Sequence, residues 1–158
     1  MTDDLIELRK NAALNRNAFE KKLNKLKKTK DNHLDEKIHA LHKAAFKNRD
    51  CLDCANCCKT LGPLLTHKDV DRIAKHLRMK PGAFIGQYLR VDEDQDYVMK
   101  QMPCAFLGSD NYCSIYDVRP KACADFPNTD LRKQKTMLHL TLKNTETCPA
   151  VYEIVEKL

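Results

Sequence analysis

The octapeptide CLDCANCC, residues Cys51–Cys58, gives the strongest indication of how this chain folds, because it holds four cysteines in two overlapping CxxC steps. Two intervening residues let the chain turn so that both sulfurs approach one ion, while amides of that turn can donate to the thiolates. Side chains of adjacent residues in an extended segment point to opposite faces. We therefore expect Cys57 and Cys58 to serve different metal sites.

Four further cysteines follow at wider spacing: Cys104, Cys113, Cys123 and Cys148. Eight thiols divide into two four-sulfur sites, which fits two structural Zn²⁺ ions or an iron–sulfur cluster with a second metal. Both alternatives remain open at this point. The first three cysteines match the start of a bacterial ferredoxin run, and Cys148 precedes a proline as the last ferredoxin cysteine does, which favours an iron–sulfur cluster. Zinc is favoured by the wide separation of the later cysteines, because a zinc site accepts remote ligand pairs without special spacing.

The chain has 158 residues and a net charge of +6, and it begins with acidic residues rather than with the apolar stretch of a signal peptide. No apolar run approaches the ~18 residues that would span a bilayer. These features predict a cytoplasmic protein without a membrane segment. Cytosolic thiols are kept reduced, so the cysteines indicate metal ligands rather than disulfides.

Composition changes near residue 50. Residues 1–50 contain 13 Lys and Arg against 8 Asp and Glu, and every Cys, Gly and Pro lies after Asp50. We therefore predict a basic helical arm or hairpin over residues 1–50 and an eight-cysteine metal-binding domain over residues 51–158. Apolar residues at helical spacing support the arm, with Thr2 as its N-cap and a break at residues 29–32, where Asp31 or Asn32 would cap a second helix.

The sequence of residues 51–158 predicts short elements separated by turns. Thr66 and Asp69 resemble a capping box that opens a helix, and Pro81 and Pro149 each fit the first position of another. Residues 89–91 and 97–99 flank an acidic turn and could pair as a hairpin, and residues 105–116 contain a second turn. The predicted fold class is therefore mainly α with small irregular β-hairpins, a metal-stabilised cysteine-cluster domain preceded by a helical arm.

Four motifs resemble a known family: CxxCxxCC at Cys51–Cys58, PCAFL at Pro103–Leu107, YCSIYDVRPKACADFP at Tyr112–Pro127, and CPA from Cys148. Together they are similar to the zinc- or iron-chelating domain family, also called YkgJ-like CxxCxxCC cysteine-cluster proteins. The resemblance covers about residues 51–150. It implies chelation of zinc or iron, or of an iron–sulfur cluster, by a ligand set that fills every position of the pattern: Cys51, Cys54, Cys57, Cys58, Cys104, Cys113, Cys123 and Cys148.

Two other functions stay open. Flagellin lysine methylases resemble this family through a similar cysteine run, which would make the chain an iron–sulfur redox or lysine methyl-transfer enzyme, although no nucleotide or methyl-donor fingerprint is present. The basic arm could bind a protein partner or nucleic acid, but its cations alternate with acids and it has only two aromatics. We interpret His39 and His42 as solvated helix histidines, and Arg119 and Asp117 as residues that hold the loop between Cys113 and Cys123.

Overall fold

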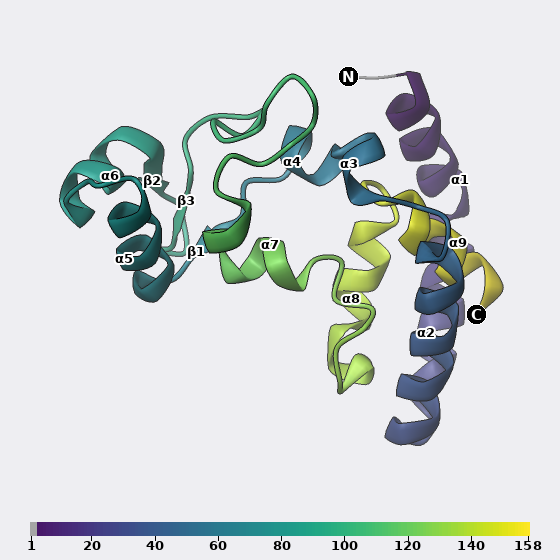
Figure 1. Ribbon diagram of the computed structural model, residues 1–158. Helices are drawn as coiled ribbons and strands as arrows, with labels where there is room; N and C mark the ends of the chain where they lie inside the picture. The colour runs from purple at the N-terminus through teal and green to yellow at the C-terminus, as the bar shows by residue number, and fades with distance from the viewer. Residues whose placement is uncertain (1–2) are drawn as a thin grey trace. The chain divides into compact units, whose positions relative to one another are not determined.

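The computed structural model describes residues 3–158 and divides the chain into two compact units (Figure 1). Unit 1 contains the residues up to Asp50 together with Pro127–Leu158, and unit 2 contains Cys51–Phe126. The segment 127–158, which the sequence analysis assigns to the cysteine domain, instead packs with the N-terminal helices. The predicted N-cap Thr2 lies outside the described residues.

Unit 1 is a helical assembly whose members lie side by side in Figure 1. It consists of α1 (Asp3–Leu26), α2 (Asp31–Phe46), α8 (Gln134–Asn144) and α9 (Pro149–Lys157). The apolar stripes of the two N-terminal helices face those of α8 and α9. Their buried residues form one cluster, so burial of these faces explains why the C-terminal segment joins unit 1: Phe19, Leu23, Leu34, Ile38, Leu138, Val151 and Val155.

Charged side chains of the N-terminal helices stabilise the ends of the C-terminal helices. The Asp35 carboxylate of α2 accepts hydrogen bonds from the backbone N–H groups of Lys133 and Gln134, each at 2.8 Å, at the start of α8. The Lys22 ammonium of α1 donates to the backbone oxygens of Val155 and Glu156 near the end of α9. Free N–H and C=O groups at helix ends need such partners. These contacts fix α8 and α9 against the N-terminal helices.

One local prediction for this region is wrong. The second helix begins at Asp31 and its N-cap is Lys30, which makes no side-chain capping bond. Neither Asp31 nor Asn32 is therefore the cap. Packing of Leu34 and Ile38, both fully buried, stabilises this helix without a capping side chain.

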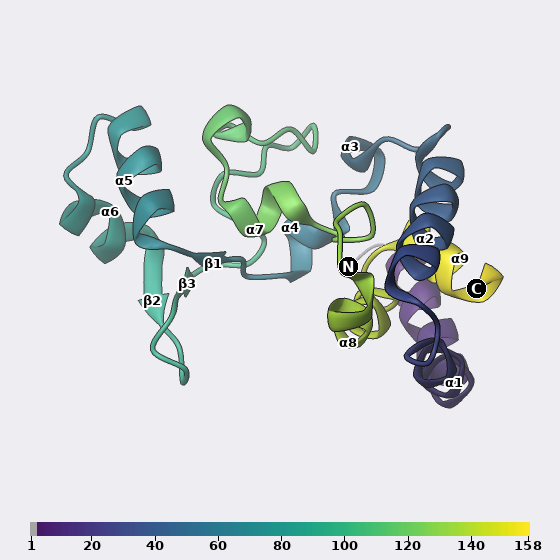
Figure 2. The ribbon, with the colours of Figure 1, turned by 90° about the horizontal axis from the view of Figure 1, so that it is seen from below.

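Unit 2 contains a small antiparallel sheet with the strand order β1-β3-β2. Its strands are β1 (Leu64–Leu65), β2 (Leu89–Val91) and β3 (Tyr97–Met99), and β2 and β3 form the predicted hairpin. Two helices, α5 (His67–His76) and α6 (Pro81–Tyr88), pack beside one another and next to these strands (Figure 2). The mainly α fold class with small β-hairpins is thus confirmed.

The core of unit 2 lies between these helices, the sheet and the loop that follows β3. Its buried residues come from every one of these elements: Leu65, Val70, Ile73, Ala74, Phe84, Leu89, Met99, Phe106 and Ile115. The capping box predicted at Thr66 and Asp69 is present, and Pro81 occupies the first turn of α6 as expected. Cys104 and Cys113 are half-buried against this core. The core therefore supports the loop that carries two of the candidate ligands.

The remaining elements of unit 2 are short and carry the other cysteines. They are α3 (Cys51–Cys54), α4 (Asn56–Thr60), the 3₁₀ turn η1 (Tyr116–Val118) and α7 (Lys121–Asp125). Across residues 3–158, none of the helices combines the length and the apolar composition needed to cross a bilayer.

Candidate metal centre

The CxxCxxCC run folds as two short helices rather than as an extended strip. Helix α3 carries Cys51 and Cys54, and α4 carries Cys57 and Cys58. Between them Ala55 adopts the left-handed conformation with φ 47°, which turns the chain sharply. The four thiols of the run therefore lie on two helical segments that meet at a corner.

Two side-chain contacts hold this corner. The Lys59 ammonium donates to the backbone oxygen of Cys54 at 2.7 Å, across the turn from α4 to α3. The Asn111 side-chain amide donates to the backbone oxygen of Leu52 at 2.9 Å, which ties α3 to the tip of the loop between Cys104 and Cys113. The run is thus attached to the loop that holds two later cysteines.

The expectation that Cys57 and Cys58 point to opposite faces is wrong in its premise, because both residues are helical. Their sulfurs lie 3.9 Å apart. The hydrogen bond between the two thiols raises the pKa of Cys57 and lowers that of Cys58, and the nearby Lys59 cation also lowers the pKa of Cys58. Cys58 is therefore the sulfur of this pair that ionises first.

Cys104 and Cys113 share one local arrangement on the loop that follows β3. Burial raises the pKa of both thiols, while each accepts a hydrogen bond from the backbone N–H two residues later, from Phe106 and Ile115 respectively, which lowers it. Phe106 and Ile115 are themselves buried in the core. Amide donors of this kind stabilise thiolates bound to a metal. Cys104 and Cys113 therefore each lie in a turn that is packed against the core and that supplies an N–H donor to the sulfur.

The backbone brings Cys58, Cys104 and Cys113 together. The N–H of Cys104 donates to the backbone oxygen of Cys58 at 2.9 Å. Leu107 and Cys113 form an antiparallel bridge, and Leu107 N–H also bonds to the Cys104 oxygen. This ladder links α4 to both arms of the loop, as Figure 1 shows for α4 and the loop beside it.

Cys123 completes the group from α7. Burial, together with repulsion from the nearby thiols of Cys58, Cys104 and Cys113, raises the pKa of Cys123 to about 12. Cys58 likewise raises the pKa of Cys104 and of Cys113, and Cys113 raises that of Cys104. Each of the six pairs among these four thiols is thus within electrostatic range. Within residues 3–158, no three His, Cys, Asp or Glu side chains already stand around one point as a metal would require.

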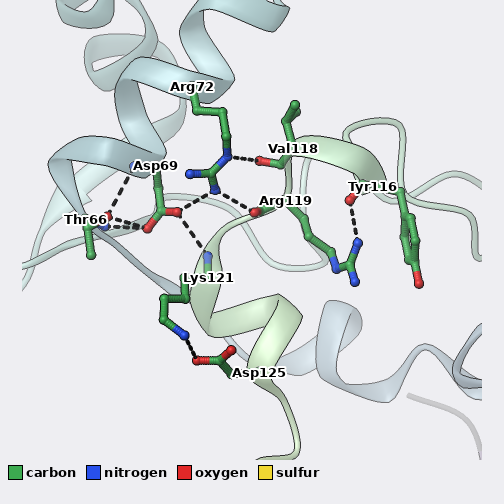
Figure 3. A network of polar contacts seen from close by, with 8 residues as sticks. All are labelled: Thr66, Asp69, Arg72, Tyr116, Val118, Arg119, Lys121 and Asp125. Carbon is green, nitrogen blue, oxygen red and sulfur yellow. Dashed lines mark hydrogen bonds and ion pairs between the residues drawn. The ribbon is translucent and has the colours of Figure 1, made fainter.

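A buried carboxylate fixes the segment between Cys113 and Cys123. Asp69 of α5 accepts hydrogen bonds from the N–H and the hydroxyl of Thr66, from the Arg72 guanidinium and from the backbone N–H of Lys121 at 3.0 Å. Figure 3 shows these donors converging on the one carboxylate. Burial alone would raise the pKa of Asp69, but these hydrogen bonds outweigh it and lower the pKa.

Arg72 extends the same network to the residues before α7. Its guanidinium donates to the backbone oxygens of Val118 and Arg119 as well as to Asp69. The sequence signal at Asp69 was local, a capping box, and gave no sign of this contact with residues some 50 positions later. Asp69 and Arg72 are therefore positioning residues that the sequence analysis missed.

Arg119 holds the loop as the sequence analysis expects. Its guanidinium donates to the backbone oxygen of Tyr116 at 2.7 Å and stacks 3.9 Å from the centre of the Tyr116 ring. The cation also lowers the pKa of Cys113 and of Cys123, against the larger effect of burial. A positive charge thus lies beside two of the candidate thiolates.

The other predicted site residues lie in different surroundings. Cys51 is exposed and Cys54 half-buried on α3, whereas Cys148 belongs to unit 1, where it is the N-cap of α9 and packs against the helical core. His39 and His42 also belong to unit 1. They are half-buried rather than fully solvated as expected, and a ring nitrogen of each bonds to the Leu131 oxygen or the Thr129 hydroxyl.

The donor set suits a thiophilic metal. All eight cysteines are free thiols, and thiolates favour zinc and iron–sulfur centres over hard cations. Bound metal would supply the positive charge that lets four neighbouring thiols ionise together. The Arg119 cation and the amide donors at Cys104 and Cys113 would then offset part of the remaining negative charge.

Comparison with known proteins agrees with this donor set. No curated protein and no solved structure matches the chain significantly. A family model described as "CxxCxxCC: Putative zinc- or iron-chelating domain" matches residues 50–149, which covers seven cysteines of unit 2 together with Cys148. The match spans more than half of the chain and confirms the family expected from the four motifs. This protein therefore belongs to the CxxCxxCC family of zinc- or iron-chelating domains.

Proposed function

We propose that this protein binds zinc or iron through cysteine thiolates at two metal sites, and that the bound metal is a structural part of its cysteine-rich region. The observation that carries the proposal is the grouping of Cys58, Cys104, Cys113 and Cys123, which come from three separate segments of unit 2 yet all lie within electrostatic range of one another. The family match points to the same chemistry.

The buried thiols, whose pKa values are raised, are better suited to bind a metal than to act as nucleophiles. A nucleophilic cysteine needs a lowered pKa and an accessible, cationic setting. Burial raises the pKa of Cys104, Cys113 and Cys123, and each has further thiols as neighbours. Without a cation such thiols remain protonated, and a bound metal ion would supply the charge that lets them ionise together.

Zinc and an iron–sulfur centre differ in an observable way. A four-thiolate Zn²⁺ site is tetrahedral and colourless because the ion is d¹⁰, whereas iron–sulfur clusters absorb visible light. We also propose a cytoplasmic location, where thiols are kept reduced and all eight free cysteines would be available to bind metal.

Elemental analysis of the full chain, purified without air, tests the proposal. We expect about two metal equivalents if both sites hold a single zinc, and a larger, coloured iron content if one holds a cluster. Protein treated with a strong chelator is the control. A content of zinc and iron no higher than that of the chelated control would contradict the proposal.

Loss of metal should also alter the structure. Structural zinc contributes roughly 10 to 16 kcal/mol of apparent binding free energy, as much as the whole stability of a typical domain. We expect hydrogen exchange to rise on chelation across α4, the loop of residues 104–115 and α7. Residues 67–88, whose helices α5 and α6 pack on the apolar core of unit 2, provide the internal comparison. Unchanged exchange with the metal demonstrably removed would refute a structural role.

A further inference from the structure

We propose that the solvent-facing side of α1, with the turn that follows it, binds the phosphate backbone of double-stranded nucleic acid without reading its sequence. The contact surface is a set of four lysines that we call the lysine row: Lys10, Lys21, Lys25 and Lys28. This function is separate from metal binding, since the row belongs to unit 1 and contains no candidate metal ligand.

The positive charge of the chain is concentrated in one segment. Residues 8–30 contain nine Lys and Arg and a single acid, Glu20, which gives this segment a charge of +8. The rest of the chain contains 19 Lys and Arg against 21 Asp and Glu, so its charge is −2 and the total is +6. A surplus that is localised on one element, rather than spread over the surface, creates a potential that attracts polyanions.

The helix places the lysine row on one exposed side. An α-helix has 3.6 residues per turn, so residues three, four, seven and eleven positions apart lie on the same side. Lys21, Lys25 and Lys28 follow at intervals of four and three, and Lys10 precedes Lys21 by eleven residues. All four lysines are exposed. The opposite side of α1 carries its buried residues: Leu5, Ala12, Phe19 and Leu23.

Other cations of α1 are used within unit 1, whereas the lysine row is not. Arg16 forms an ion pair with Glu146 at 2.7 Å, and Lys22 donates to two backbone oxygens at the end of α9. In the part of the chain that the structure describes, no ammonium group of the lysine row has a hydrogen bond or an ion pair to another protein group. The row therefore keeps its full charge for a partner.

The dipole of α1 does not account for the whole row. A cation near the last turn of a helix is favoured by the helix dipole, and Lys25 lies in that turn. Lys28 follows it, and its N–H bonds to the Lys25 oxygen. The dipole effect falls off beyond the last turn, so it gives no reason for the exposed Lys10 and Lys21.

The acids of residues 1–50 do not neutralise this side of α1. In the sequence they alternate with the cations, but the structure separates the two kinds of charge. Asp31 forms an ion pair with Lys135, and Asp35 accepts hydrogen bonds from the first backbone N–H groups of α8, so α8 engages both carboxylates. All acids of α1 except Glu20 lie before Lys10, in the first two turns: Asp3, Asp4 and Glu7.

A duplex backbone fits this surface better than a single strand or a membrane does. Phe19 is the one aromatic residue of α1 and is 5% exposed, so the helix offers no ring on which an unpaired base could stack. A helix that binds a membrane surface inserts a continuous apolar face. That face of α1 is buried against α8 and α9, and its exposed large apolar side chains are Ile6 and Leu14, eight residues apart.

The length of the row suits several phosphate contacts. From Lys10 to Lys28 the chain rises about 27 Å at about 1.5 Å per residue. A duplex carries one charge per ~1.7 Å of its axis, hence about 16 phosphates over this length. Four lysine–phosphate contacts predict that the logarithm of the binding constant falls with the logarithm of the salt concentration with a slope of about −3.6.

Binding of a short mixed-sequence DNA duplex to the full, metal-loaded chain tests the proposal. Fluorescence anisotropy of the labelled duplex at several salt concentrations gives the affinity and the salt slope. Lys21→Gln, Lys25→Gln and Lys28→Gln together remove three of the four contacts, so the slope should change from about −3.6 to about −0.9. At about 0.1 M salt each contact contributes up to about one power of ten, so the affinity should fall at least tenfold.

Three exposed lysines of unit 2 provide the matched control, each replaced by Gln: Lys68, Lys75 and Lys80. Both triple variants lower the net charge by the same amount, so a difference between them reports where the charge lies rather than how much there is. Arg at the three row positions keeps the charge and should keep the affinity. Circular dichroism checks that each variant retains its helices, and the wild-type salt slope needs no variant.

Four results would overturn the proposal: an equal loss in the two triple variants, a wild-type affinity that does not depend on salt, tighter binding of a single strand than of the duplex, or tighter binding of vesicles of phosphatidylserine and phosphatidylcholine. A second duplex of unrelated sequence should bind equally, because phosphates carry no sequence information. A metal-loaded chain that does not bind the duplex refutes this proposal and leaves the proposed function intact.

Discussion

Replacing Asp69 with Asn tests whether the buried carboxylate holds the cysteine loop in place. The side chain of Asp69 is 2% exposed, and its two oxygens accept four hydrogen bonds: Oδ2 from the N–H and hydroxyl of Thr66, Oδ1 from Arg72 and from Lys121 N–H. Asn keeps the size of the side chain but turns one of these oxygens into an NH₂ group. Whichever way the amide is turned, two donors lose their acceptor.

The expected cost follows from those two bonds. A hydrogen bond to a charged group contributes roughly 1.5 to 3 kcal/mol, and Arg72 is partly exposed and can regain a bond to water, so the lower value applies. Two lost bonds at about 1.5 kcal/mol each lower the free energy of unfolding by about 3 kcal/mol. This corresponds to roughly a hundredfold change in the ratio of folded to unfolded chain.

Urea unfolding of the metal-loaded protein, followed by circular dichroism, measures this change as a lower midpoint at unchanged slope. Hydrogen exchange should show the loss at one of two backbone amides, that of Lys121 if the NH₂ group replaces Oδ1 or that of Thr66 if it replaces Oδ2. Asp71→Asn is the matched control, because Asp71 is an exposed residue of the same helix and its substitution should change the stability by no more than about 0.5 kcal/mol. An Asp69→Asn protein as stable as the control would refute the reasoning.

Three further outcomes follow from the same structure. Arg119→Ala should raise the pH at which acid releases the metal. The Arg119 cation lowers the pKa of Cys113, so without it protons compete better with the metal for the Cys113 sulfur, and metal content measured against pH shows the shift. Ile73→Ala should cost about 2 to 5 kcal/mol in urea unfolding, because this core side chain is fully buried. Because the pKa of Asp69 is lowered in the folded protein, the Asp69 carboxylate stabilises the fold fully above about pH 4, and this contribution is lost as the pH falls through the lowered pKa. The stability difference between wild type and Asp69→Asn should therefore shrink below about pH 4, and a constant difference would contradict this.

Elements with a strong local pattern were predictable from the sequence. Four features follow from residue spacing or from single residues with a defined conformational role: the apolar stripe of the N-terminal helices, the capping box at Thr66, the proline at the start of α6, and the pairing of residues 89–91 with 97–99. The family was predictable as well, because the cysteine spacing is specific.

The helical form of the CxxCxxCC run was not predictable from its pattern. A four-residue helix such as α3 is too short to show periodicity, and its turn depends on a left-handed Ala55 where sequence favours glycine or asparagine. The placement of α8 and α9 in unit 1 depends on apolar contacts with residues more than 100 positions earlier, which no local signal reports. The contact of Asp69 with Lys121 was not predictable either, because it joins residues far apart in the sequence.

The order of the units along the chain has an energetic consequence. Unit 1 is discontinuous, so α2 and α8 can meet only after the 76 residues from Cys51 to Phe126 have been brought round to join them. The entropy lost in closing a loop grows with the logarithm of the length of freely moving chain. Metal ions bound as proposed would shorten that freely moving chain, which would favour the contacts of Leu34 and Ile38 with Leu138. Metal binding within unit 2 would then also stabilise the helical assembly of unit 1.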